Sequence, residues 1–208
     1  MNQEQIWDEI AEPWHNYRKA ILPEVKEFLK KQKGNVLDLG CGSGRNFTKL
    51  SGVIYAVDFS KRMLELAEAR AKEAKIDVKF FKNETDNLQF KDNFFDAAIF
   101  IAVLHCIETE EKRKKSLKEL FRVLKPGAEA IITVWDKDQE RFKNSPKENK
   151  IPWTKDEKKY LRYYYLYEKE EITTLIKNTG FEITKVYNQE AQPLNYSKKN
   201  IILIIKKP

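Results

Sequence analysis

The sequence predicts an α/β protein with a doubly wound, mostly parallel sheet of seven strands, in which the last strand is antiparallel. Three observations predict this fold. Short apolar runs alternate with amphipathic segments along the 208 residues, and such alternation produces parallel βαβ units. A glycine-rich segment directly follows the first apolar run, as in strand-to-helix turns that bind ligands. The last two apolar runs are separated by a short connection, which requires one of them to run antiparallel.

The predicted strands are apolar runs with few polar interruptions. Runs of this length, bounded by turn residues, indicate buried strands. In chain order, the predicted strands are residues 35–40, 53–58, 78–82, 94–102, 128–135, 181–187 and 200–206.

The predicted helices occupy the segments before and between these strands. Residues 3–33 are predicted to be helical, with Pro13 and Pro23 as breaks because proline disrupts a helix interior. Ser60 caps the helix that runs to Ala74, since a serine hydroxyl accepts the free amide hydrogens of the first turn. The other predicted helices are residues 45–50, 110–124 and 168–179.

The segment from Lys137 to Lys159 is polar and contains Pro146 and Pro152, so we predict a long loop there. A chain of this length builds one sizeable core. We therefore expect a single domain over residues 1–208, with a helical cap at residues 1–33 and a substrate-side loop and tyrosine-rich segment at residues 137–167.

The composition indicates a soluble globular protein. Lys and Arg number 39 against 32 Asp and Glu, and the resulting formal charge of +7 favours polyanionic partners. The N-terminus lacks the features of a signal peptide, and no apolar stretch is long enough to span a bilayer. Cys41 and Cys106 show no metal-ligand spacing, so we expect neither a disulfide nor a metal site. These features predict a cytoplasmic protein.

The strongest motif runs from Val36 to Gly44 and reads VLDLGCGSG. Its glycines let the backbone turn tightly and approach a ligand closely. Asp58 ends the next strand, where a carboxylate can accept both hydroxyls of a ribose. The glycine spacing departs from the dinucleotide fingerprint, and Asp38 suits an ammonium group better than a pyrophosphate. The motif therefore predicts an S-adenosylmethionine pocket, and a glycine turn without a ligand is the alternative.

Four segments together carry a resemblance to a known family. They are DLGCGSG at residues 38–44, Asp58 with Phe59 and Ser60 after it, FDAAI at residues 95–99 and RVLKPG at residues 122–127. With these segments the whole chain resembles the class I S-adenosylmethionine-dependent methyltransferases, which have a Rossmann-like fold. The resemblance implies that S-adenosylmethionine is the cofactor.

The same resemblance implies which residues bind the cofactor. Asp38 and the loop glycines would hold the methionine part, and Asp58 the ribose. Phe59 and Met63 would flank the adenine, although ordinary core packing is the alternative for Met63. The full set of expected cofactor-binding residues is Asp38, Gly40, Cys41, Gly42, Gly44, Arg45, Asn46, Asp58, Phe59, Ser60, Met63, Glu84, Thr85, Ile101 and Ala102.

A finer resemblance concerns the substrate. The segments that carry it are IAEPWHNYR at residues 10–18, LPEV at 22–25, IAVLHC at 101–106, TEEKR at 109–113, ITVW at 132–135 and YLRYYYLY at 160–167. They are similar to the tRNA wobble-uridine carboxymethyl methyltransferases. The resemblance implies esterification of the carboxylate of 5-carboxymethyluridine at the wobble position of tRNA.

Arg18 and His105 are the expected catalytic residues. Arg18 would hold the substrate carboxylate because a guanidinium fork matches its geometry. His105 follows the fourth predicted strand, at the sheet edge where ligands bind. The family commonly has a second histidine at the next position, and Cys106 departs from that pattern. The alternatives are an ion pair for Arg18 on its own helix and simple packing for His105.

Two macromolecular partners are expected. The tRNA anticodon loop would contact the basic segment from Lys137 to Lys159 and the tyrosines after it, since phosphates attract lysine and unstacked bases lie on aromatic faces. The alternative is a solvated lysine surface with Tyr163 and Tyr167 in the core. The predicted strand Val78–Lys82 is normally an edge in this fold, and its apolar character invites an added strand. The resembled enzymes work with a small zinc-binding activator protein, which we expect at this edge. A neighbouring helix that covers the edge is the alternative, and no membrane contact is expected.

Two other functions are weighed against this one. The first is a methyltransferase that acts on a small molecule, such as a quinone or a carboxylic acid. The second is a non-catalytic tRNA-binding subunit that keeps the fold without the chemistry. The basic segment and the tyrosines argue against the first, and the intact Asp38, glycines and Asp58 argue against the second.

Overall fold

The sheet has the predicted architecture in a computed structural model, which describes residues 1–187 and 200–208. Its strand order is β3-β2-β1-β4-β5-β9-β8. β9 runs antiparallel to both of its neighbours, and the other neighbouring pairs are parallel. The predicted antiparallel last strand is therefore confirmed, and the connection before it lies outside the described residues. The strands are β1 (Lys33–Leu39), β2 (Ser51–Asp58), β3 (Val78–Lys82), β4 (Phe95–Ile101), β5 (Leu124–Trp135), β8 (Glu182–Tyr187) and β9 (Asn200–Lys206).

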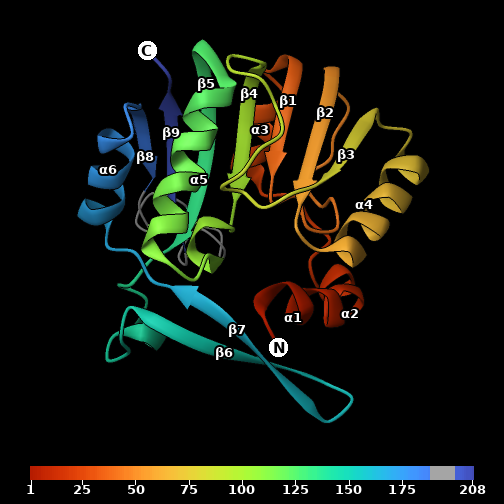
Figure 1. Cartoon of the computed structure of the whole chain (residues 1–208), viewed down its shortest axis with the longest axis vertical. Helices are drawn as coiled ribbons and strands as arrows, with labels where there is room; N and C mark the ends of the chain where they lie inside the picture. Colours follow the sequence, from red (N-terminus) through yellow and green to blue (C-terminus); the bar gives the residue numbers. More distant parts are fainter. Residues whose placement is uncertain (188–199) are drawn as a thin grey trace.

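Helices cover both faces of this sheet, with α5 in front of it and α3 behind it in Figure 1. On the α3 face, Val25 and Leu29 pack with strand residues such as Ile99. On the other face, Leu117 of α5 and Ile172 of α6 join a larger cluster of buried residues. The helices are α1 (Gln3–Glu9), α2 (Ala11–Tyr17), α3 (Pro23–Leu29), α4 (Lys61–Ala74), α5 (Glu110–Val123) and α6 (Lys169–Asn178).

The strand order places the ligand-binding crevice. The chain runs from β1 outward to β2 and β3, whereas β4 leads to β5 on the opposite side. A crevice forms between such diverging strands, outside their carboxyl ends. In Figure 1 these ends face α1, α2 and the hairpin of β6 and β7. The loop after β1 and the residues after β4 therefore meet beneath the N-terminal helices.

The helix boundaries confirm some predictions and correct others. The Ser60 hydroxyl accepts the Met63 N–H at 3.1 Å, and α4 ends at Ala74 as predicted. Pro13 is not a break, because it lies in the first turn of α2, where its missing N–H has no intrahelical partner to lose. The helix predicted at residues 45–50 is absent, since these residues form turns and irregular backbone around the glycine loop.

The prediction of a long loop from Lys137 to Lys159 is wrong. Much of this segment belongs to an antiparallel hairpin of β6 (Glu148–Lys155) and β7 (Lys158–Tyr165). Its turn residues Asp156 and Glu157 have φ values of 48° and 61°. Glycine and asparagine usually supply such positive φ values in hairpin turns. The turn therefore lacks the ordinary sequence signal of a hairpin.

The N-terminal helices connect this hairpin to the sheet domain. Gln3 Oε1 accepts the Tyr163 N–H at 3.0 Å, and Lys155 Nζ donates to the Glu9 carbonyl at 2.6 Å. On the other side of α1, the Ser60 hydroxyl donates to Asp8 Oδ1 at 2.5 Å. α1 is thus held between the hairpin and the start of α4. Within residues 1–187 and 200–208, no helix is long and apolar enough to cross a membrane.

Candidate active site

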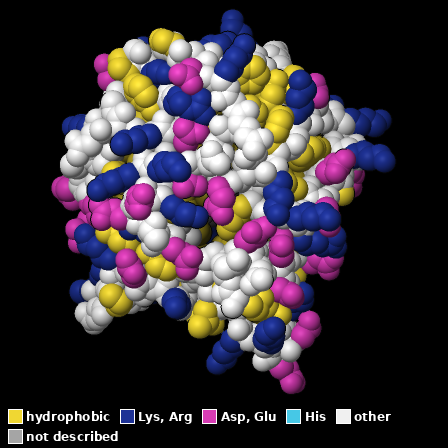
Figure 2. Space-filling model, in the orientation of Figure 1, with side chains coloured by type: hydrophobic (Ala, Val, Ile, Leu, Met, Phe, Trp, Pro, Cys, Tyr) yellow, Lys and Arg dark blue, Asp and Glu magenta, His cyan; other side chains and the backbone are white. Residues whose placement is uncertain are grey.

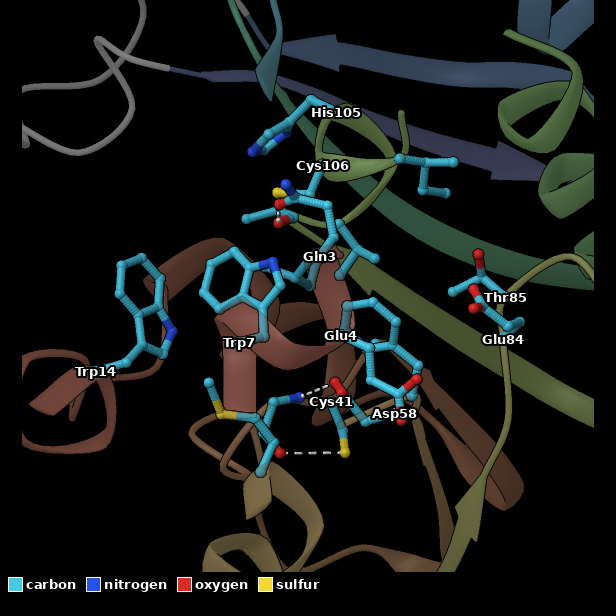
Figure 3. A pocket seen from close by; sticks show the side chains of 18 of the residues that line it. Gln3, Glu4, Trp7, Trp14, Cys41, Asp58, Glu84, Thr85, His105 and Cys106 are labelled. Atoms are coloured by element: carbon cyan, nitrogen blue, oxygen red, sulfur yellow. Dashed lines mark hydrogen bonds between the residues drawn. The ribbon is translucent and has the colours of Figure 1, made fainter. Parts of the chain in front are cut away.

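A pocket of about 340 Å³ opens at the carboxyl ends of β1, β2 and β4. Figure 3 shows Cys41 and Asp58 at one end of this pocket and His105 and Cys106 at the other. Trp7 of α1 lies between the two ends. The pocket can therefore hold one ligand against the glycine loop and a second ligand beside His105, next to each other in the same cavity.

The three loop glycines serve different purposes. A Cβ on Gly40 would lie 2.4 Å from the Val103 side chain, and a Cβ on Gly44 would lie 2.4 Å from the Phe47 ring. These two glycines allow close packing inside the protein. Gly42 has a φ of +53° and no atom within 4 Å of an added Cβ. Its backbone therefore faces the open pocket, and a side chain there would occupy the space of a ligand.

Asp58 connects the glycine loop to the end of β2. Its Oδ2 accepts the Gly42 N–H at 2.8 Å, and its Oδ1 accepts the Ser60 N–H at 2.9 Å. Burial raises the pKa of Asp58 to about 6, and these backbone hydrogen bonds oppose the rise. Each carboxylate oxygen keeps a lone pair that can accept a further hydrogen bond. Asp58 therefore fixes the loop and also presents an acceptor to the pocket.

Asp38 lies one strand away, on β1, which pairs with β2 along its whole length. The side chain is 1% exposed, and among the described residues neither carboxylate oxygen has a hydrogen-bond partner. Burial raises the pKa of Asp38 to about 8, the Arg45 charge opposes the rise and Asp58 reinforces it. A buried carboxyl without a donor is unfavourable unless a ligand supplies one. The ammonium group of a bound amino acid fits this requirement.

The predicted residues at the adenine end also line the pocket. Phe59, Met63, Glu84 and Thr85 all contribute to its wall. Met63 is 2% exposed and packs with Ile6 and other buried residues, so it belongs to both the core and the pocket. The Thr85 hydroxyl shares a hydrogen bond with the Ser116 hydroxyl at 2.7 Å.

The structure brings nearly all of the predicted site residues together. Asp38, Gly44 and Ser60 are the exceptions, because they are not among the residues that line the pocket. Ser60 caps α4, and its hydroxyl also donates to Asp8. The predicted residues that line the pocket are Arg18, Gly40, Cys41, Gly42, Arg45, Asn46, Asp58, Phe59, Met63, Glu84, Thr85, Ile101, Ala102 and His105.

His105 is held in one protonation state. Its Nδ1 accepts the Trp135 N–H at 3.2 Å, which places the ring proton on Nε2. The ring stacks against Trp135 and Tyr164, with centroid distances of 5.4 and 5.5 Å. Burial, reinforced by the charge of Arg18, lowers the pKa of His105 to about 3. His105 is therefore a neutral hydrogen-bond donor at physiological pH.

Several pocket residues were missed by sequence reasoning. Asn2 and Gln3 of the N-terminal segment line the pocket, as do Trp7, Trp14 and Tyr164. For Trp14 the available signal was its place shortly before the predicted catalytic Arg18 in the sequence. The tyrosines of this region were expected to contact RNA, with a core position for Tyr163 and Tyr167 as the alternative. The alternative holds for both, and Tyr160 and Tyr164 are buried as well. Their hydrophobic rings build the hairpin and its contact with the sheet domain.

A doubly wound sheet with a glycine loop and two acids at its crevice defines the class I S-adenosylmethionine-dependent methyltransferases. Comparison with known proteins agrees with this class. Residues 37–132 match the family described as a methyltransferase domain. Residues 37–132 thus form a methyltransferase domain, and the predicted fold family and S-adenosylmethionine cofactor are confirmed.

Two relatives and one solved structure narrow the comparison. A tRNA (carboxymethyluridine(34)-5-O)-methyltransferase of Arabidopsis thaliana is 35% identical over 139 residues, which are 65% of this chain and 33% of that protein. The enzyme of the same name from Schizosaccharomyces pombe is 27% identical over 206 residues, covering 86% of this chain and 88% of that protein. The chain therefore spans about a third of the length of the Arabidopsis thaliana relative.

The solved structure is a complex between the Trm112 methyltransferase activator of Haloferax volcanii and a candidate methyltransferase. The match has a TM-score of 0.72 and 15% identity, and it covers 100% of this chain and 98% of the other. At this level of identity the likeness shows the fold.

Proposed function

We propose that this protein transfers the methyl group of S-adenosylmethionine to the carboxylate of 5-carboxymethyluridine at the wobble position of tRNA. The observation that carries the proposal is that Arg18 and His105 line the same pocket as the glycine loop. A guanidinium and a neutral N–H donor suit a carboxylate. The names of the Arabidopsis thaliana and Schizosaccharomyces pombe relatives support this substrate.

The proposed reaction needs placement more than acid–base chemistry. A carboxylate has an ordinary pKa of about 4, so it is already an ionised nucleophile at neutral pH. Bound S-adenosylmethionine supplies an electrophilic methyl group on a cationic sulfur. Arg18 and His105 would bind one carboxylate oxygen and leave the other free to attack. Correct orientation of two reactants removes a large part of such a barrier.

The test uses labelled S-adenosylmethionine and tRNA that already carries 5-carboxymethyluridine, with and without an activator protein. We expect an alkali-labile methyl ester on the wobble uridine. Unmodified tRNA is the control, since it lacks the carboxylate. Labelling of quinones or small carboxylic acids with none on the modified tRNA would refute the proposal.

The state of His105 leads to a prediction about pH. With saturating cofactor and tRNA, protonation of His105 should cause no change in rate between pH 5 and 8, because this histidine is neutral throughout that range. His105→Phe removes the donor and should lower kcat/KM by roughly tenfold or more. His105→Gln keeps an N–H near the Nε2 position and should lose less. A step near pH 6.5 that disappears in His105→Gln would contradict this role.

The tRNA would approach over the hairpin and the mouth of the pocket. Lys150, Lys158 and Lys159 of the hairpin are exposed, as phosphate contacts require. Tyr17, at the end of α2, is 66% exposed and offers an aromatic face next to Arg18. Figure 2 shows further Lys and Arg side chains mixed with Asp and Glu on the face that carries α5. Both cysteines are free, which suits a cytoplasmic setting for this reaction.

The proposed site for an activator protein is β3, which lies at one end of the sheet. The Ile54 N–H donates to the Asp77 carbonyl, and the Asn83 N–H donates to the Asp58 carbonyl. In a parallel ladder, every second residue of a strand directs its peptide groups to the same neighbouring strand. Asp77 and Asn83 bond with β2, so the peptide groups of Phe80, which lies at the intervening set of positions, point away from β2. An added strand could pair with them. The Haloferax volcanii complex supports an activator of this kind as the partner.

This proposal predicts different behaviour for two variants of one residue. Phe80→Pro removes an N–H that β2 does not use and should weaken binding of a Trm112-type activator at least tenfold more than Phe80→Ala does. Phe80→Ala is the matched control, because it removes the ring contact with Phe47 but keeps the N–H. Co-purification and titration of the activator measure the difference. Equal binding by the two variants would exclude strand addition at β3.

A further inference from the structure

Arg162 of β7 lies in a cluster of aromatic side chains that we call the arginine cage. Its guanidinium carbon is 5.2 Å from the ring centroids of Trp14, Trp153 and Tyr164 and 5.8 Å from that of Trp7. The rings come from α1, α2, β6 and β7. Aromatic faces attract a cation through their quadrupole. The cage therefore holds the guanidinium in place.

The charge of Arg162 is buried, and the described residues place no neutralising acid beside it. The residue is 6% exposed, and it forms no salt bridge among the residues that the structure describes. Nη1 donates to the Tyr164 hydroxyl at 2.8 Å, whereas the buried Nε has no hydrogen-bond partner in the described part of the chain. A buried charge is costly unless something compensates for it. If the cage had only a packing role, a neutral side chain in place of Arg162 would avoid this cost.

The arginine cage forms part of the pocket wall. Trp7, Trp14 and Tyr164 contact the guanidinium and also line the pocket. Cys106 lines the pocket too, and burial raises the pKa of its thiol to about 12 while the Arg162 charge opposes that rise. The positive field of Arg162 therefore reaches the pocket surface beside His105, where low dielectric strengthens it.

We propose that Arg162 determines substrate specificity by favouring an anionic group in this pocket over a neutral group of the same shape. Its fixed charge lies against the rings of the pocket wall and acts through its field, without contact with the substrate. The proposal rests on the proposed function, because it concerns how the same site distinguishes a carboxymethyl group from its uncharged amide. Arg18 would make the direct contact, and Arg162 would be a positioning residue.

The test compares two anticodon stem-loops that differ only at the wobble uridine, one with a carboxymethyl group and one with a carbamoylmethyl group. Their dissociation constants are measured with S-adenosylhomocysteine bound. Arg162→Gln should reduce the preference for the acid by about tenfold and leave binding of the amide nearly unchanged. Arg162→Lys keeps the charge and should keep the preference. The proposal would be overturned if Arg162→Gln weakened binding of both stem-loops equally. It would also be overturned if Arg162→Gln and Arg162→Lys changed the preference for the acid by the same factor.

A second pair of variants leaves Arg162 and its cage in place. Ile151 pairs directly with Arg162 across the hairpin. Ile151→Glu would set a carboxylate beside the guanidinium and should reduce the acid preference as Arg162→Gln does. Ile151→Gln has the same size without the charge and should not. If wild type binds neither stem-loop, the proposed function fails; if it prefers the acid and all variants keep that preference, only the role of Arg162 fails.

Discussion

Asp58→Ala should weaken binding of S-adenosylmethionine by about a hundredfold or more. The variant loses the acceptor that the pocket offers to a ribose, and hydrogen bonds to a charged acceptor contribute roughly 1.5–3 kcal/mol each. It also leaves the N–H groups of Gly42 and Ser60 without their acceptor, so the glycine loop loses the contact that fixes it. Isothermal titration calorimetry measures the affinity. Asp77→Ala, which removes an exposed acid before β3, is the control for the change in charge.

The two buried acids also predict how cofactor affinity depends on pH. Burial raises the pKa of Asp58 to about 6 and that of Asp38 to about 8, so in the free protein both acids hold protons at low pH. A cationic ligand binds better to the ionised acids, and its binding therefore releases protons. Affinity should rise as the pH increases from 5 to 8. Asp38→Asn should flatten the upper part of this rise, and an unchanged profile in that variant would exclude Asp38 as the partner of the ammonium group.

The fold was predictable because its signals are local. The strands at the centre of the sheet are apolar runs with few polar interruptions, since helices bury both of their faces. The α4 helix was predicted closely because a serine cap and a regular apolar face mark it. The residues of the glycine loop and Asp58 were predictable as well, because each lies at the end of a strand and strand order alone brings them together.

The hairpin and the arginine cage could not be predicted in this way. In β6, Asn149, Ile151 and Trp153 are partly buried and alternate with exposed residues, but the alternating residues include lysine and proline and the turn has no glycine. The cage depends on tertiary contacts between helices near residue 10 and strands near residue 160. No local pattern reports that Trp14 and Arg162 lie 5.2 Å apart, ring centroid to guanidinium carbon.

Arg18→Ala should lower kcat/KM for carboxymethylated tRNA by roughly 100- to 1000-fold and leave the affinity for S-adenosylmethionine unchanged. Arg18 lines the substrate end of the pocket, and its guanidinium lies 5.2 Å from the Trp14 ring and 5.3 Å from the Tyr17 ring. These rings fix its direction, and an error of about 1 Å in the position of a reacting group can lower a rate a hundredfold. Single-turnover assays measure the methyl transfer, and calorimetry measures the cofactor.

Arg18→Lys separates the charge from the geometry at this position. Lysine keeps the positive charge but lacks the rigid, planar guanidinium whose N–H donors fix the direction of the carboxylate oxygen they bind. We therefore expect Arg18→Lys to recover part of the substrate affinity and little of the single-turnover rate, whereas Arg162→Lys should behave like wild type. The contrast follows from the two positions, since Arg18 lines the pocket and the Arg162 charge reaches it through a wall of aromatic rings. Full activity in Arg18→Lys would mean that charge alone holds the substrate, and Arg18 would then lose its role in orienting the attacking oxygen.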